Sequence, residues 1–251
     1  MTTPTLESLP AREQRAQTSV DDTTAEAWKP LYRIAAVAAL LSVAFIVIAG
    51  IVFAINPPPT TIAGWFKLYH DNWLVGLLDG DLMMLASYIL MGLIYFALYG
   101  ALRRVNQPFM ALATALAFVG MAAYYTANPA FSMLSLSNQH AAATSATERT
   151  ALLGAGQAVI TNWTGSAFDA AYFLSAIAVL IVSVVMLRST IFSRWTAYAG
   201  LAIGVLTLVP ATAGTVGVVF SFVSLLPTII WFLLIAWRFF QLGGTPIKRV
   251  V

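Results

Sequence analysis

Six long apolar stretches separated by short polar segments constrain this chain more than any other feature of its sequence. The stretches cover approximately residues 34–55, 81–102, 109–126, 167–187, 195–209 and 216–240. The hydrocarbon core of a bilayer is about 30 Å thick, and a helix needs about 20 apolar residues to cross it. A backbone exposed to lipid must satisfy its own hydrogen bonds, so each stretch is expected to be helical. The sequence therefore predicts an all-α integral membrane bundle of six transmembrane helices.

The composition agrees with a membrane protein. Hydrophobic residues make up 60% of the chain and charged residues only 9%, whereas about a quarter of the residues in a soluble domain are charged. The chain contains no Cys, which excludes disulfides, a thiolate nucleophile and a thiolate metal site. Only two His are present, and no cofactor is predicted.

The Lys and Arg residues lie mainly on one side of the predicted spans. With the N-terminus placed inside, the inner side holds 11 of the 13 cations, namely Arg12, Arg15, Lys29, Arg33, Arg103, Arg104, Arg188, Arg194, Arg238, Lys248 and Arg249. Cations near the ends of spans are retained in the cytoplasm, so both termini are predicted to be cytoplasmic, in a multi-pass protein of the inner or plasma membrane. The same rule explains the net charge of +3. The predicted partner is therefore the lipid bilayer and not nucleic acid.

The polar ends of the chain divide it into a membrane domain and two tails. Residues 1–27 mix charges of both signs and lack an apolar period. They are predicted to be a disordered cytoplasmic tail, and they lack the apolar core of a signal peptide. Residues 28–242 form the predicted membrane domain, and residues 243–251 form a short basic cytoplasmic tail.

Two segments on the outer side are too long to be simple turns. Residues 60–78 carry four aromatic residues at helical spacing, which is typical of a helix lying in the membrane interface. In the second segment, Ser145 and Glu148 have the spacing of a capping box, so a helix is predicted over residues 145–160. Together the two segments predict a small extracytoplasmic helical cap.

Ionisable residues inside spans are costly and usually face the interior of a bundle or a wet cavity. Asp81 and Asp169 lie near the outer ends of the second and fourth spans. Tyr88 shares a helix face with Asp81, and Tyr172 shares one with Asp169. Together with His140 from the outer side, these residues are predicted to form an acidic and aromatic patch that opens outward and binds a ligand.

Each member of this patch has a structural alternative. Asp79 and Asp81 would cap the N-terminus of the second span, and Asp169 would accept a hydrogen bond from a Tyr across the bundle. His70 and Asp79 are further candidates for a metal site, because carboxylate and imidazole ligands suit zinc. The alternative for His70 is a solvated side chain beside Asp71. No metal is assigned, because metalloprotease and hydrolase motifs are absent from the sequence.

Gly200 and Gly204 form a pattern of two small residues four positions apart in the fifth span. Such a pattern lets two helices approach closely. It predicts either packing within the bundle or a homo-oligomer whose seam uses these two glycines.

Three runs carry a resemblance to a family: DLMMLASYILMGLIYFALYGALRRVNQP, AYFLSAIAVLIVSVVMLRSTIFSRWTAYAGLAIGVLTL and IIWFLLIAWRFF. They resemble bacterial six-span membrane proteins that are catalogued as a domain of unknown function. The resemblance covers residues 30–242 and implies a bacterial inner-membrane protein. It brings no catalytic or binding residues with it.

Two functional hypotheses follow from these patterns. The favoured one is a non-enzymatic membrane protein that binds a small ligand, lipid or partner through the outer patch. The alternative is a small transporter or intramembrane enzyme that uses Asp81 and Asp169. A transporter is expected to have several broken helices near the midplane, and Pro227 supplies one. An enzyme would need a nucleophile paired with a base, and the sequence shows no such pair.

Overall fold

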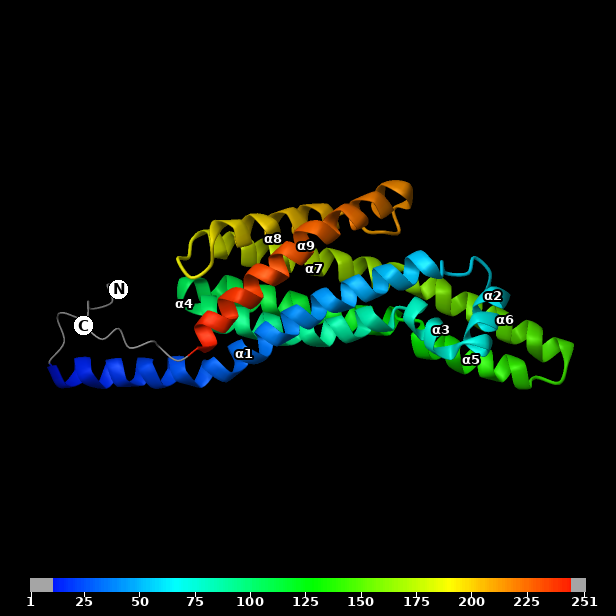
Figure 1. The fold of residues 1–251 in the computed structure, drawn as a ribbon, viewed down its shortest axis with the longest axis horizontal. Coiled ribbons are helices and arrows are strands. Elements are labelled where there is room, and N and C mark those ends of the chain that lie inside the picture. Colours follow the sequence, from blue (N-terminus) through cyan, green and yellow to red (C-terminus); the bar gives the residue numbers. More distant parts are fainter. Residues whose placement is uncertain (1–10, 245–251) are drawn as a thin grey trace.

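The computed structural model describes residues 11–244, and every regular element in that range is a helix (Figure 1). The helices are α1 (Ala11–Ile55), α2 (Ile62–Asp71), α3 (Trp73–Asp79), α4 (Leu82–Ala127), α5 (Ala130–Ala142), α6 (Ala146–Trp163), α7 (Ser166–Leu187), α8 (Arg194–Thr207) and α9 (Gly214–Gly243). The prediction of an all-helical fold is therefore confirmed.

Four helical stretches within the described range are long and apolar enough to cross a membrane. They are Glu26–Ile55, Leu82–Ala142, Ala146–Leu187 and Gly214–Gly243. Many large apolar side chains lie on the outer surface of these helices, and Ile55 and Leu226 are 71% and 67% exposed. Soluble proteins rarely expose apolar surface on this scale. The surface of the molecule is therefore suited to lipid.

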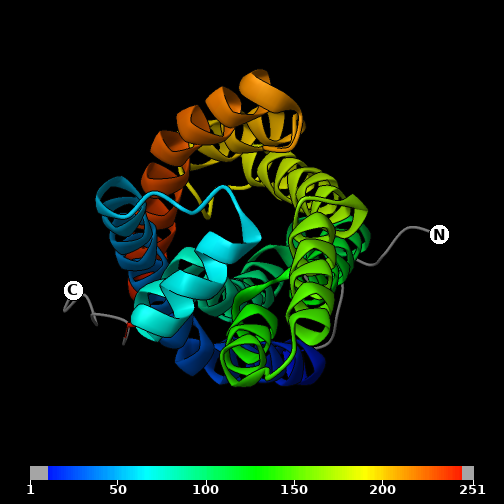
Figure 2. The same cartoon turned by 90° about the vertical axis from the view of Figure 1, so that its right-hand side faces the viewer.

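Five helices surround the main core in a closed ring. Going round the ring, α1 packs against α4, α4 against α7, α7 against α8, α8 against α9, and α9 against α1. Figure 2 looks along this bundle and shows the helices arranged around a common axis. The ring is closed by the packing of α9 against α1, which lie near opposite ends of the chain.

The helix α4 is two helices joined at a sharp bend. Asn106 has non-helical dihedral angles (φ −158°, ψ 89°), and its Oδ1 accepts a hydrogen bond from the backbone N–H of Phe109 at 3.3 Å. Pro108 lies in the first turn of the second half of α4. Backbone N–H groups in the first turn of a helix have no acceptor within the helix, so the missing N–H of Pro108 does not destabilise it. The bend is at the turn that the sequence placed between the second and third spans.

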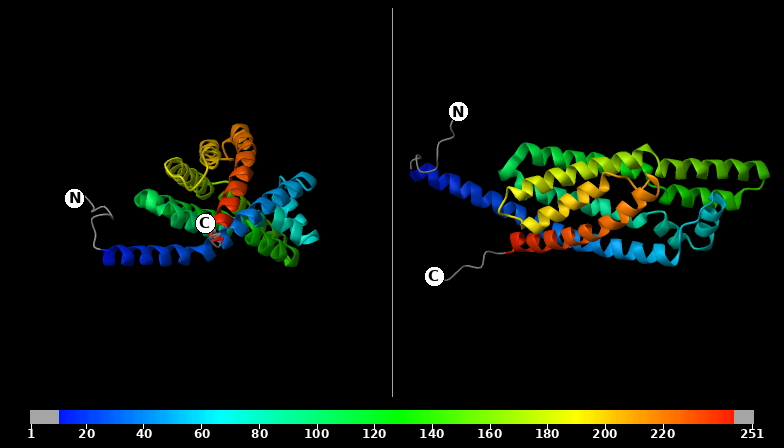
Figure 3. Two further views of the ribbon diagram at one scale, coloured as in Figure 1. Left: turned by 60° about the vertical axis from the view of Figure 1, so that its left-hand side comes forward. Right: turned by 90° about the horizontal axis from the view of Figure 1, so that it is seen from above.

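The helices α2, α3, α5 and α6, called the distal helices here, form a second cluster at one end of the bundle (Figures 1 and 3). The core of this cluster consists of Trp65, Phe66, Tyr69, Leu77, Ala130 and Met133. Ser137 on α5 donates a hydrogen bond to the carbonyl of Phe66 at 2.8 Å. The aromatic residues at positions 65, 66 and 69 are therefore buried between helices, and they do not lie exposed in an interface as the sequence predicted.

The predicted helix over residues 145–160 is observed as α6. Ser145 is its N-cap and accepts a hydrogen bond from the N–H of Glu148 at 3.2 Å, so the capping signal is confirmed. The helix α5 was not predicted. Its sequence, AFSMLSLSNQHAA, mixes Ser, Asn, Gln and His with apolar residues and is only 13 residues long. Such a short segment is stable only because it packs against α2 and α6.

The helix of the first span extends beyond the residues predicted for it. The helix α1 begins at Ala11, so it includes residues 11–27 of the segment predicted to be a disordered tail. That segment contains no Gly or Pro and is rich in Ala, Glu and Gln, which favour helix and let the helix of the first span continue. Residues 1–10 and 245–251 lie outside the described residues, including nearly all of the predicted basic tail.

Gly200 and Gly204 are used for packing within the chain. Both are buried on α8. A Cβ at Gly200 would overlap the Ser183 hydroxyl on α7, and a Cβ at Gly204 would overlap Leu180 on the same helix. Of the two predicted uses of these glycines, close approach of helices inside the bundle is the one observed.

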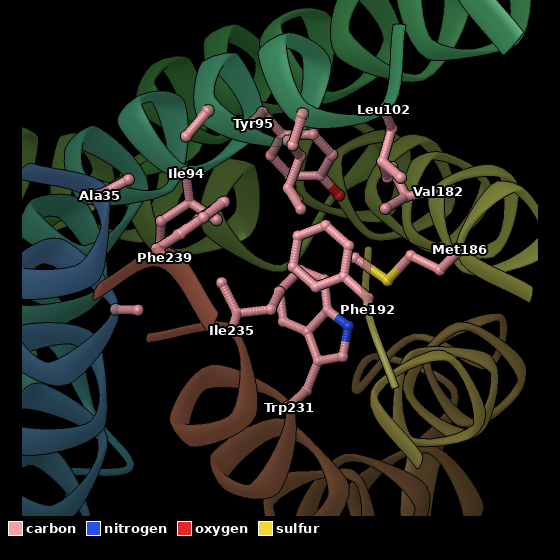
Figure 4. Packing of buried hydrophobic residues seen from close by; sticks show 14 of the residues in the cluster. Ala35, Ile94, Tyr95, Leu102, Val182, Met186, Phe192, Trp231, Ile235 and Phe239 are labelled. Carbon is pink, nitrogen blue, oxygen red and sulfur yellow. The ribbon is translucent and has the colours of Figure 1, made fainter. Parts of the chain in front are cut away.

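The core around Ala35 of α1 and the C-terminal half of α9 is closely packed (Figure 4). Trp231, Ile235 and Phe239 of α9 project towards Tyr95 of α4 and Met186 of α7, and all five side chains are at most 3% exposed.

Candidate functional site

A cavity of about 280 Å³ lies inside the ring, between α1, α4, α7, α8 and α9. Ten of its 21 lining residues carry a hydroxyl group, and none of them is Lys, Arg, His, Asp or Glu. The remaining surface is apolar and includes Met84, Met91 and Met121. Flexible methionine side chains adapt to ligands of varied shape. The cavity therefore combines neutral polar groups with an adaptable apolar wall.

Five of the seven Ser and Thr hydroxyl groups of the wall donate to a carbonyl of their own helix. Ser42 donates to the Ala38 carbonyl at 2.9 Å, Ser87 to Met83 at 2.9 Å, and Thr228 to Ser224 at 2.7 Å. Because each hydroxyl proton is already used, the lone pairs of these oxygens remain as hydrogen-bond acceptors. The wall therefore suits a neutral molecule that brings its own hydroxyl or amide donor.

Tyr95 and Tyr88 supply aromatic surface on the α4 side of the cavity. Figure 4 shows the Tyr95 hydroxyl pointing from α4 towards the middle of the bundle. Tyr172 lines the neighbouring wall, on α7, with its hydroxyl 3.4 Å from that of Ser221 on α9. The structure thus brings Tyr88 and Tyr172, two of the predicted site residues, to one cavity.

Asp81 is linked to this cavity through two tyrosines. Its carboxylate accepts a hydrogen bond from the Tyr124 hydroxyl, and the Tyr124 ring stacks on Tyr88 with centroids 4.3 Å apart and planes 7° from parallel. Asp81 occupies the N-cap position of α4, but its side chain makes no capping bond, and its backbone is left-handed (φ 74°). The Asp81 carboxylate therefore accepts a hydrogen bond from a Tyr on another helical segment. The sequence predicted this arrangement as one alternative for Asp169.

Asp169 lies in the first turn of α7 and bonds to a different element. Its carboxylate accepts a hydrogen bond from the hydroxyl of Thr212, in the loop between α8 and α9. The sequence-based alternative assigned it a Tyr partner, and the structure gives it a Thr. Neither Asp169 nor Asp81 lines the cavity. Each carboxylate instead connects its helix to another segment, Asp81 to Tyr124 and Asp169 to the loop between α8 and α9.

The two histidines lie among the distal helices. His140, a predicted member of the patch, occupies the last turn of α5, where its ring packs on Phe66 with centroids 5.2 Å apart. Ala130, at the start of α5, lies beside Gly80, the residue before Asp81. His140 is ten residues further along the helix, or about 15 Å at 1.5 Å per residue, and is therefore distant from Asp81. His70 is exposed at the end of α2. Among the side chains that the structure describes, those of residues 26–244, no three His, Asp or Glu gather into a potential metal site.

Asp79 is buried at the end of α3, and it caps no helix. It is only 8% exposed, and its Oδ2 has no hydrogen-bond partner among the described residues. The hydroxyl of Tyr69 is also buried without a partner, and it lies where a side chain at Gly80 would be. Burial raises the pKa of Asp79 to about 6, and burial together with the nearby Asp79 charge raises the pKa of Tyr69.

Asp79→Asn is expected to stabilise the protein at pH 8 and to have little effect at pH 4. The folded-state pKa lies above the usual carboxyl value of 3.8, so the fold binds a proton that the unfolded chain releases. Stability is then lost as the pH rises from about 4 through about 6, by about 1 kcal/mol after allowance for solvent screening. The thermal midpoint in neutral detergent across this pH range measures the effect.

Asp71→Asn is the matched control for this experiment. Asp71 is exposed and accepts a hydrogen bond from Lys67 at 2.6 Å, which lowers its pKa. Its replacement is expected to give no gain at pH 8. Parallel pH profiles of wild-type protein and Asp79→Asn would contradict the assignment.

Several lining residues were missed in the sequence, although one signal pointed to them. Ser221, Ser224 and Thr228 recur at helical spacing on α9, an otherwise strongly apolar helix, and all three line the cavity. Such a polar stripe on a spanning helix is expected to face the interior. Tyr124 and Thr212 carried no comparable signal, because each is defined by a partner 43 residues away.

No protein-family model, curated protein or solved structure matches this chain. The resemblance to six-span bacterial membrane proteins therefore stays a prediction, and the functional interpretation depends on the geometry of the cavity.

Proposed function

We propose that this protein is a non-enzymatic, six-span protein of the bacterial inner membrane that binds a neutral amphipathic molecule in the cavity between its helices. The observation that carries the proposal is the wall of that cavity, with ten hydroxyl-bearing residues and no formally charged side chain among 21. An ionic ligand would have no counter-charge there, and burying an unpaired charge is costly.

The six-span topology is supported by the directions of the helices. The bend at Asn106 divides the apolar stretch Leu82–Ala142 into two antiparallel segments. The helix α8 has 14 residues, about 21 Å at 1.5 Å per residue. It packs between α7 and α9 and returns the chain from the end of α7 to the start of α9 (Figure 1). With its flanking residues, α8 supplies the fifth crossing.

The orientation is supported by the positions of the cations. The bend at Asn106, the turn between α7 and α8, and the end of α9 lie at the same end of the bundle (Figures 1 and 3). These segments carry five of the ten Arg residues, at positions 103, 104, 188, 194 and 238. Because cationic segments stay in the cytoplasm, we place this end, called the basic end below, inside. The distal helices then form the extracytoplasmic cap.

The ligand class follows from the hydrogen-bonding capacity of the wall. Its oxygens mainly accept hydrogen bonds, and its Met, Phe and Leu side chains offer apolar contact. A long-chain alcohol or a monoacylglycerol has the complementary chemistry, with hydroxyl donors on one end and a flexible apolar body. The alternative of a transporter or enzyme that uses Asp81 and Asp169 gains no support from their contacts, because each bonds to a different element.

Ala117→Phe is expected to weaken the binding of monoolein by about tenfold or more, which corresponds to about 1.4 kcal/mol. Ala117 is 1% exposed and lines the cavity, so a phenyl group there would occupy ligand volume. Ala115→Phe is the matched control, since Ala115 is exposed on the same helix. Titration of the purified protein in neutral detergent measures the dissociation constants.

The proposal also predicts how ligand charge affects binding. Oleylamine, which is cationic with a similar chain, is expected to bind at least about tenfold more weakly than monoolein, because no carboxylate lines the cavity. Equal affinities of Ala117→Phe and Ala115→Phe for monoolein, or tighter binding of oleylamine, would overturn the proposal.

A further inference from the structure

An apolar groove lies on the surface of the bundle, between α4 and α7, at the basic end. Its volume is about 230 Å³, and its walls are apolar and include Phe109, Ile181 and Val184. Arg188 and Asn106 also line it and provide its polar groups. Phe109 is 53% exposed and Val184 is 42% exposed, so the groove faces the surroundings of the bundle and is separate from the internal cavity.

The charge of Arg188 is not balanced by an acidic residue among the described side chains. The ion pairs between described side chains are Lys29–Glu26 and Lys67–Asp71. Glu26, on α1, forms an ion pair with Lys29 at 3.1 Å. The described carboxylates at positions 71, 79, 81, 148 and 169 belong to the distal helices or the helix ends beside them. Among the described side chains, the basic end therefore carries an excess of cations.

The dimensions of the groove suit one leaflet of a bilayer. Leu180 and Arg188 both line it, and eight residues of helix span about 12 Å. Half of a hydrocarbon core of about 30 Å is about 15 Å. A guanidinium at one end of an apolar groove of this length is therefore at the depth where a lipid phosphate lies.

We infer that this groove binds an anionic phospholipid, with one acyl chain against α4 and α7 and the phosphate on Arg188. A guanidinium forms strong, charge-assisted hydrogen bonds with phosphate oxygens, and cationic residues beside a membrane attract anionic lipids. The Oδ1 of Asn106 already accepts the N–H of Phe109, which leaves its amide N–H groups to donate to the same headgroup. The inference does not depend on the ligand of the internal cavity.

The test measures binding of dioleoyl phosphatidylglycerol and dioleoyl phosphatidylcholine to the full-length protein in neutral detergent, by native mass spectrometry. The anionic lipid is expected to bind more tightly than the zwitterionic one. Arg188→Gln is expected to weaken phosphatidylglycerol binding by about tenfold or more, since a charged hydrogen bond contributes about 1.5–3 kcal/mol. Arg188→Lys, which retains the charge, is expected to recover part of the loss.

Arg194→Gln is the matched control, because Arg194 is exposed and begins α8, six residues beyond Arg188, and does not line the groove. It removes the same charge and is expected to leave the affinity within about twofold. Val184→Trp fills the groove and is expected to weaken binding of both lipids while the thermal midpoint is maintained.

Three outcomes would overturn the inference. Equal losses in Arg188→Gln and Arg194→Gln would show that only the general surface charge attracts the lipid. Equal binding of the two lipids to the wild type would remove the role of the anionic headgroup. Binding of glycerol 3-phosphate as tight as that of phosphatidylglycerol would show an anion site without an acyl chain.

Discussion

Tyr124→Phe is expected to lower the free energy of unfolding by about 2–3 kcal/mol, because it removes the hydroxyl group that donates to the buried carboxylate of Asp81. The Tyr124 hydroxyl donates to that carboxylate, and Tyr124 is 2% exposed. Unfolding in mixed detergent, followed by circular dichroism, measures the loss. Tyr125→Phe is the control, since Tyr125 is the next residue but is 39% exposed. Its replacement is expected to change stability by less than about 0.5 kcal/mol.

A double-mutant cycle with Asp81→Asn isolates the interaction between the two side chains. Asp81 has a left-handed backbone (φ 74°), a conformation that Asn also tolerates. The substitution therefore removes the charge without adding backbone strain. The two single changes are expected to be coupled by about 1–3 kcal/mol. If their effects add without coupling, Tyr124 and Asp81 do not stabilise each other.

Gly200→Ala is expected to destabilise the bundle by about 2–3 kcal/mol, as overpacking of a core does. The added Cβ would overlap the Ser183 hydroxyl and lie 2.9 Å from Nε1 of Trp231. That hydroxyl cannot rotate freely, because it donates to the Val179 carbonyl at 2.7 Å. The two helices would therefore have to move apart. The shift in the thermal midpoint in neutral detergent measures this cost.

Two further variants show whether the cost comes from the contact between α7 and α8. Gly154 lies inside α6, and a Cβ at this position would have no other atom within 4 Å, so Gly154→Ala is expected to be neutral or to stabilise by up to about 1 kcal/mol. Adding Ser183→Ala to Gly200→Ala removes the overlapping oxygen and is expected to recover part of the loss. A Gly200→Ala variant as stable as wild type would mean that α7 and α8 are not closely packed here.

The helices of the bundle could be predicted from the sequence because their signals are local. An apolar stretch of sufficient length predicts a helix, and the polar turn before Pro108 predicts the bend that is observed at Asn106. The capping signal at Ser145 depends on a residue three positions away. In each case the residues that determine the structure are neighbours in the chain.

The contacts of the candidate site could not be predicted in the same way. Asp81 and Tyr124 are 43 residues apart, and their pairing depends on how the two halves of α4 align after the bend. The helix α5 has 13 residues, which is too short for a helix that is stable alone, so it depends on packing against α2 and α6. The placement of His140 among the distal helices follows from that packing, so the sequence alone placed it too close to Asp81.

The internal cavity could be predicted from the sequence only in part. The Ser and Thr residues of α9 form a visible stripe, which predicts that this face of the helix points inward. The volume of the cavity and its other walls depend on the closed ring of α1, α4, α7, α8 and α9. Only the assembled bundle shows that these hydroxyl groups face Tyr88 and Tyr172 across one space.

The most direct test of the proposed function is to find where a photoreactive monoacylglycerol attaches to the protein. The probe carries a diazirine in its acyl chain, and labelled peptides are identified by mass spectrometry after irradiation in neutral detergent. We predict labelling of cavity residues on separate helices, such as Met121 of α4, Val179 of α7 and Leu225 of α9, suppressed by excess monoolein and by Ala117→Phe. Labelling confined to lipid-facing residues such as Leu226 and Val119, unchanged by excess monoolein, would contradict binding in the cavity.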